Sequence, residues 1–274
     1  MFITGHMGIT TRMTRRNQEK PQREKKALHL GWIPGVLFKP RATFRKIIDA
    51  NKPSWLTPLL LLTFLVVIFV LLAAPVRREI VQSGSNIPQD FQYWSQDQQQ
   101  QFLDAQANLT SPAFMYVFPF LGTAAGYWVV WFLFGSILYL VNTLAGSRAS
   151  RQTVSNVVAW SMVPFALRVI VQTVAVLASR NLITQPGLAN LVPADATGFL
   201  VYLRGVLSVV DIYWVWHLVL LLISARPLSA LKPSKAILGV LVAMLVLLLL
   251  QGLPSLLSSL LGGLSGSSSY YFYY

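Results

Sequence analysis

The most constraining feature of the sequence is an almost wholly apolar stretch, residues 154–178, with Arg168 near its middle. At about 1.5 Å of rise per residue, a helix of this length crosses a hydrocarbon core about 30 Å thick. A guanidinium at that depth is costly, so another helix or water must provide a polar partner for it. The stretch predicts a membrane-spanning helix whose neighbours accommodate Arg168.

The remaining apolar stretches agree with this interpretation. Hydrophobic residues make up 54% of the chain and charged residues only 11%, against about 25% charged in soluble domains. We predict an all-α, multi-pass membrane helix bundle with five transmembrane helices. They are expected at residues 55–75, 113–144, 154–178, 198–224 and 236–252. Pro254 is expected to interrupt the continuation of the last one.

The stretch 113–144 is too long for one upright crossing. It fits one tilted helix, or two short helices broken around Gly122 to Gly126. We expect one helix, because a connector buried at that depth would leave backbone groups without hydrogen bonds.

The distribution of charge predicts the topology. Segments 1–54, 146–152 and 225–235 hold 17 of the 22 basic residues and three acidic ones, whereas the alternate loops hold three basic and five acidic residues. Basic residues favour the cytoplasmic side of a membrane. The N-terminus is therefore expected in the cytoplasm and the C-terminus outside.

Three regions follow from these patterns. Residues 1–29 are expected to be a disordered basic tail, 30–264 the membrane domain and 265–274 a flexible aromatic tail. A helix opened by Pro40 would place Phe44 on one side and Arg41, Arg45 and Lys46 on the other, as in a helix lying at the membrane surface. A solvated basic linker is the alternative. A second interfacial helix is expected within the polar loop 79–112.

The best candidate site is an intramembrane pair, Arg168 with Asp211, which lie at similar depths in the third and fourth predicted spans. Pairing would offset the cost of burying two charges. The pair could form a polar path across the bundle, but an ion pair that fixes helix packing is favoured. Gly122 and Gly126 form a small-xxx-small pattern for close helix packing, and Pro164 should bend the third span.

The sequence gives little indication of catalysis. It has no cysteine and only three scattered histidines, so we expect no metal site and no cofactor. His217 is expected to serve in packing or in a hydrogen bond. No phosphate-binding loop, dinucleotide fingerprint or hydrolase motif is present, and the chain is not expected to be an enzyme.

Two short motifs carry a resemblance to a known family. They are Leu-Phe-Lys-Pro-Arg-Ala-Thr-Phe at 37–44 and Ala-Trp-Ser-Met-Val-Pro at 159–164. With five spans and a basic turn between the second and third, residues 30–253 resemble the Yip-domain family of Rab-interacting membrane proteins. Eukaryotic members carry an acidic cytoplasmic stretch associated with binding small GTPases, whereas this N-terminus is basic. The resemblance implies a prokaryotic-type member at the plasma membrane.

Two functions are consistent with the sequence. The first is a non-enzymatic membrane protein that organises partners or lipids through its basic face. Its expected partners are anionic lipids on the cytoplasmic side and an unidentified membrane or cytoplasmic protein, with no nucleic acid. The alternative is a small transporter or permease component that uses Arg168 and Asp211.

Overall fold

The computed structural model describes residues 28–50, 52–83, 88, 90–183, 185–193 and 195–265, without the side chains of residues 106 and 262–265. The predicted tails, apart from residues 28–29 and 265, lie outside these ranges. The described part is all-α, with no strand. Five of its helices are long and apolar enough to cross a membrane, so the predicted fold class is confirmed.

The helices are joined mostly by short connections. In chain order they are α1 (Trp32–Phe38), α2 (Pro40–Asp49), α3 (Leu56–Gln82), η1 (Phe91–Tyr93), α4 (Gln96–Leu109), η2 (Ala113–Val117), α5 (Phe118–Leu144), α6 (Arg151–Ser161), α7 (Val163–Ser179), η3 (Ala189–Leu191), α8 (Phe199–Ser208), α9 (Ile212–Ser229) and α10 (Pro233–Ser265).

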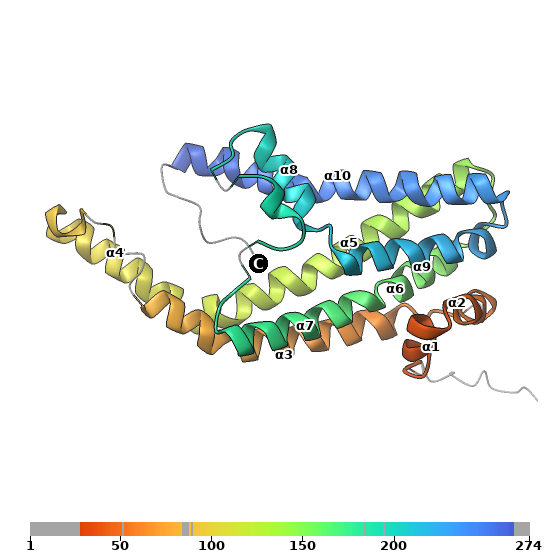
Figure 1. Ribbon diagram of the computed structural model, residues 1–274, viewed down its shortest axis with the longest axis horizontal. Coiled ribbons are helices and arrows are strands. Elements are labelled where there is room, and N and C mark those ends of the chain that lie inside the picture. Colours follow the sequence, from red (N-terminus) through yellow and green to blue (C-terminus); the bar gives the residue numbers. More distant parts are fainter. Residues whose placement is uncertain are drawn as a thin grey trace, which may run out of the picture.

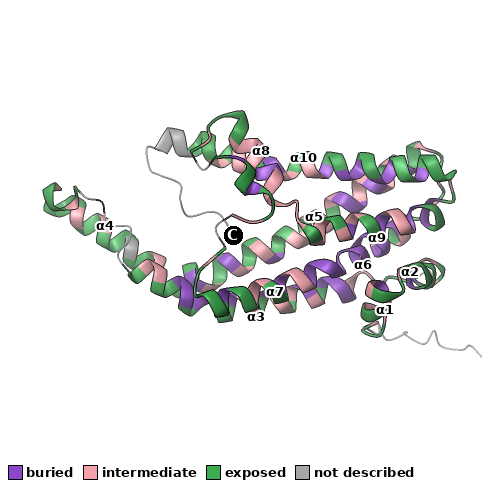
Figure 2. Cartoon of the chain, viewed as in Figure 1, coloured by how far each residue is buried: buried purple, intermediate pink, exposed green. Residues whose placement is uncertain are grey.

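The long helices form an elongated bundle (Figure 1). Helices α3 and α7 pack along each other, and α5 contacts α3 near its start and α10 near its end. Helices α1 and α2 lie at one end of the bundle, together with the turns α5–α6 and α9–α10. Helix α4 projects from the opposite end. Figure 2 shows buried residues where helices face one another and exposed residues on the outer surfaces, as a bundle surrounded by lipid requires.

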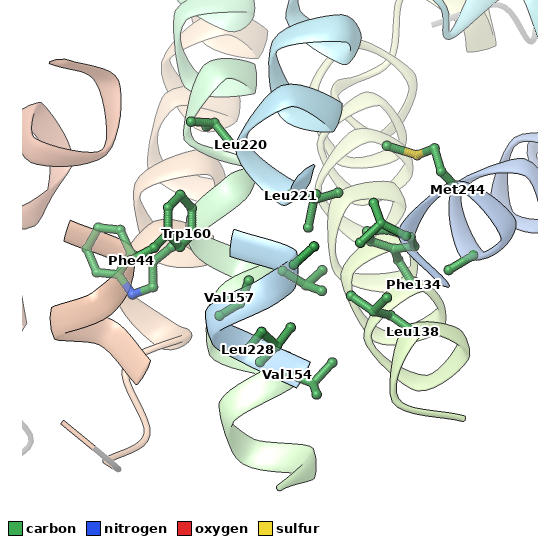
Figure 3. Close-up of a cluster of buried hydrophobic side chains, with 14 of the residues drawn as sticks. Phe44, Phe134, Leu138, Val154, Val157, Trp160, Leu220, Leu221, Leu228 and Met244 are labelled. Atoms are coloured by element: carbon green, nitrogen blue, oxygen red, sulfur yellow. The ribbon is translucent and has the colours of Figure 1, made fainter. Parts of the chain in front are cut away.

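The largest apolar cluster lies towards the end that carries α1 and α2 (Figure 3). It joins Phe44 of α2 and Trp160 of α6 to Phe134 of α5 and Leu221 of α9, all with no exposed surface. Phe44 and Trp160 come from the two motifs that carry the family resemblance, so the fold brings those motifs into one core.

The apolar face of α2 differs from the prediction. Phe44 and Ile47 are fully buried because α2 packs on α6 and α9, so this face covers protein rather than inserting into lipid. Arg41, Arg45 and Lys46 are exposed on the other side, as the pattern predicted. In the polar loop, α4 begins with a capping box of Ser95 and Gln98.

The stretch 113–144 is one continuous helix, opening with the π-helical turn η2. Helix α3 also runs past its predicted end into 79–82. As a result Arg77, expected just outside the membrane, is only 4% exposed. Its Nη1 donates to the carbonyl oxygen of Met115 at 3.0 Å, so the π-helical turn provides an acceptor for a buried guanidinium.

Two predicted spans need correction. The stretch 198–224 is not one helix: it breaks at residues 209–211, so the fourth membrane-length helix is α9, and α8, with ten residues, covers about 15 Å. Pro254 does not interrupt the last span, because α10 continues through it to Ser265. A proline within a long helix is tolerated where neighbouring groups satisfy the freed carbonyl.

Candidate functional site

The structure brings Arg168 of α7 and Asp211 together. Arg168 Nη2 lies 2.6 Å from Asp211 Oδ1, and the two side chains are 18% and 23% exposed. The guanidinium also stacks over the ring of Phe165, 4.7 Å from its centroid. Two opposite charges in contact within the membrane-spanning region cancel at short range, which removes much of the cost of placing either there.

The pair lies at the break between α8 and α9. Asp211 is the N-cap of α9, and its Oδ1 accepts a hydrogen bond from the Trp214 amide at 2.8 Å. Arg168 Nη2 donates to the carbonyl oxygen of Val209 at 3.4 Å. Non-helical backbone at membrane depth requires such partners. The geometry therefore gives the pair a structural task, which is to provide hydrogen-bond partners for backbone groups where the helix is interrupted.

A small cavity adjoins the pair where α5, α7, α9 and α10 meet. Its volume is about 50 Å³. Its polar lining comes from Tyr127, Arg168, Trp214, His217 and Gln251. The sequence analysis did not connect His217 or Gln251 with Arg168, because they lie on different helices and no spacing along the chain relates them.

The predicted helix-packing residues have different surroundings. Pro164 is buried near the start of α7. Next to it, the amide of Met162 donates to the carbonyl oxygen of Ala159, and the amide of Phe165 donates to the carbonyl oxygen of Met162. These three-residue hydrogen bonds form a tighter turn, which divides the span into α6 and α7. Gly122 and Gly126 are exposed, with open space where a side chain would begin. Within the described chain, this glycine pair does not mediate helix packing.

Two other glycines, which the sequence analysis missed, do mediate it. Gly205 of α8 and Gly252 of α10 lie where these helices cross: a Cβ on Gly205 would meet the side chain of Ser255, and one on Gly252 would meet Val206 and Tyr202. Tyr202 also donates its hydroxyl to the carbonyl oxygen of Leu249 at 2.9 Å.

Another missed residue, Asn156 of α6, ties the start of α3 to the bundle. Its Oδ1 accepts from the amides of Ser54 and Trp55 at 2.9 and 3.1 Å. Its Nδ2 donates to the carbonyl oxygen of Lys52 at 2.8 Å. The first amides of a helix lack partners inside that helix. The buried side chain of Asn156 therefore provides hydrogen-bond partners for the backbone where the chain enters the first span.

The basic residues gather at the end of the bundle that carries α1 and α2 (Figure 1). We name this surface the basic face. It is formed by ten exposed side chains: Lys39, Arg41, Arg45, Lys46, Lys52, Arg148, Arg151, Arg226, Lys232 and Lys235. At the opposite end, the exposed acids Glu79, Asp90, Asp97 and Asp104 outnumber the exposed bases Arg78 and Arg180. The two ends therefore differ in sign.

Within the described ranges, no three His, Asp or Glu side chains gather as a metal site would need. Comparison with protein families gives one finding: the family model of the Yip1 domain matches residues 35–253. Searches of curated proteins and of solved structures found no significant match. The match includes both motifs quoted from the sequence, the Arg168–Asp211 pair, four of the membrane-length helices in full and the fifth, α10, as far as Leu253. This multi-pass membrane protein belongs to the Yip1 domain family.

Proposed function

We propose that this chain is a non-enzymatic membrane protein that gathers anionic lipids, together with a membrane or cytoplasmic protein partner, at the cytoplasmic side of a prokaryotic plasma membrane. The observation that carries the proposal is the basic face, where ten exposed basic side chains lie at one end of the bundle. Positive charge on the cytoplasmic side fits both the orientation of membrane proteins and the anionic lipids of that leaflet.

The position of α1 and α2 supports lipid binding. Phe44 and Ile47 anchor α2 to the bundle, so Arg41, Arg45 and Lys46 are held in place rather than carried on a loose tail. Phe38, the last residue of α1, is 81% exposed, and an exposed aromatic ring next to basic residues suits the headgroup region. A fixed arrangement of charges loses less conformational entropy when it binds.

Lipid capture tests this proposal. The protein is placed in nanodiscs of neutral phosphatidylcholine and titrated with vesicles that contain phosphatidylglycerol. Each basic residue near an anionic surface contributes about 1 kcal/mol. We expect R41Q/R45Q to weaken capture by about 2 kcal/mol, or about 30-fold. Capture should also fall towards 1 M salt, where the Debye length is about 3 Å.

The matched control is R78Q/R180Q, which removes two exposed positive charges from the opposite end. It should change capture less than threefold. Equal losses in the two variants, or capture that does not respond to salt, would contradict a specific role of the basic face.

Transport is the second candidate, supported by the Arg168–Asp211 pair and by the cavity that Arg168 lines together with His217 and Gln251. Ion flux in proteoliposomes that disappears in both Arg168→Leu and Asp211→Asn, while the folded protein is retained, would favour it. Absence of flux in the wild-type protein would leave the pair with its structural task alone.

A further inference from the structure

Four buried polar atoms around the central cavity make no hydrogen bond of normal geometry with the described protein. They are Nδ1 and Nε2 of His217, Nε of Arg168 and Oε1 of Gln251. His217 is only 2% exposed and packs against Phe165 and Phe134, with ring centroids 5.2 and 5.7 Å away. All three polar residues line the same cavity, so their unmet hydrogen bonds converge on one place.

Such groups are rarely left unpaired, because burying a donor or acceptor without a partner is unfavourable. The backbone of Ser161 interacts electrostatically with His217, but it can serve at most one of the two ring nitrogens. In a neutral imidazole one nitrogen donates and the other accepts. With one ring nitrogen served by the Ser161 backbone, the cavity offers the other ring nitrogen, the Arg168 Nε–H donor and the Gln251 oxygen acceptor.

A water molecule, which can accept two hydrogen bonds and donate two, can bond to all three groups. A cavity needs about 10–15 Å³ of water-accessible volume to hold one water molecule, and this cavity has about 50 Å³. We propose that the cavity is a water-binding site in which one or two ordered water molecules bridge His217 of α9, Gln251 of α10 and Arg168 of α7.

The bridging water extends the polar contacts of Arg168 beyond Asp211 to His217 of α9 and Gln251 of α10. Helices α7, α9 and α10 then share one hydrogen-bonded centre.

Water-edited solid-state NMR tests the proposal. Protein with labelled histidine, glutamine and leucine is reconstituted into bilayers of deuterated lipid, and magnetisation transfer from water to side chains is followed over time. The His217→Gln variant identifies the His217 signals by their loss. We expect transfer to the His217 ring nitrogens at least threefold faster than to the methyl groups of Leu138, which is fully buried in the apolar cluster. Equally slow transfer to both residues would overturn the proposal.

A variant pair tests the bridge itself. Gln251→Leu removes one anchor of the water and should slow transfer to His217 at least twofold. Val246→Leu, on an exposed side of the same helix, should leave the rate unchanged. An unchanged rate in Gln251→Leu would overturn the three-way bridge.

Discussion

At the scale of residues, the atom with the most consequences is Oδ1 of Asp211. It accepts from Arg168 Nη2 at 2.6 Å and from the Trp214 amide at 2.8 Å. The first contact pairs a charge and the second begins α9. Because one oxygen makes both contacts, the position of the ion pair and the start of the helix are coupled. Substitutions at Arg168 and Asp211 should therefore not act independently.

We predict that Arg168→Leu lowers the free energy of unfolding by about 3 kcal/mol, because it leaves the Asp211 carboxylate without its counter-charge. Asp211→Asn should cost about 1–2 kcal/mol, since asparagine also caps helices but carries no charge. The double variant should be more stable than Arg168→Leu alone, as no unpaired charge remains. Unfolding in nanodiscs, followed by tryptophan fluorescence, measures all three values.

Additive losses in the double variant would mean that Arg168 and Asp211 do not depend on each other. Val171→Ala, at an exposed position of α7 one turn from Arg168, is the control and should change stability by less than about 0.5 kcal/mol.

The sequence was informative about charged residues in apolar stretches. It was much less informative about uncharged polar residues, which occur in both exposed and buried positions. Arg168 and Asp211 could be predicted to meet because their burial is costly unless they pair. Asn156 and Gln251 carry no such signal, because an uncharged amide is tolerated in exposed and buried positions alike. The burial of His217 depends on how three helices pack, which no local pattern records.

At the scale of elements, the crossing of α8 and α10 is a close contact that depends on small residues. Gly205 and Gly252 lie in it, whereas Gly122 and Gly126 face open space. A small-xxx-small spacing identifies a narrow strip on one helix but not the helix that faces it. This is why the sequence pointed to the wrong glycines for packing within the chain.

We predict that Gly252→Val destabilises the protein by about 1–3 kcal/mol, because its side chain would overlap Val206 and Tyr202. Gly126→Val should change stability by less than about 0.5 kcal/mol. Both variants replace a glycine by valine in a membrane-length helix, so the difference between their stabilities measures the contribution of the α8–α10 crossing. Thermal unfolding at equal protein concentration gives the comparison, and equal losses would contradict the role assigned to Gly252.

The prediction of the fourth span was wrong for a related reason. Residues 198–224 are apolar enough to read as one helix, and hydropathy does not detect a break whose backbone groups have partners elsewhere. One local sign was present: aspartate is among the preferred N-cap residues, and Asp211 precedes an apolar run. Asp211 both pairs with Arg168 and caps α9, and only the need for a counter-charge is evident from its apolar surroundings in the sequence.

At the scale of the whole molecule, the two ends of the bundle differ in charge, and this difference should determine which end stays in the cytoplasm. The basic face combines segments that are far apart in the sequence, and the fold places them at one end (Figure 1). The separation was predictable from the sequence, because each span reverses the side of the next loop. The packing of α2 on α6 and α9 was not.

The predicted orientation can be tested because the chain has no cysteine. A cysteine at Lys232, on the basic face, should react with an impermeant maleimide only after the cells are permeabilised. A cysteine at Asp104, in α4, should react on intact cells. Both positions are exposed, so a difference in labelling reports the side of the membrane. The reverse pattern would contradict the orientation.

The unequal lengths of α9 and α10 affect the surrounding bilayer. Helix α9 has 18 residues, about 27 Å, and α10 has 33 residues, about 50 Å. A hydrocarbon layer of uniform thickness matches one of them at most, so α10 must tilt or extend beyond the layer. Lipids next to α9 and lipids next to α10 then experience different hydrophobic mismatch. The protein would deform the membrane asymmetrically and favour regions whose thickness already varies.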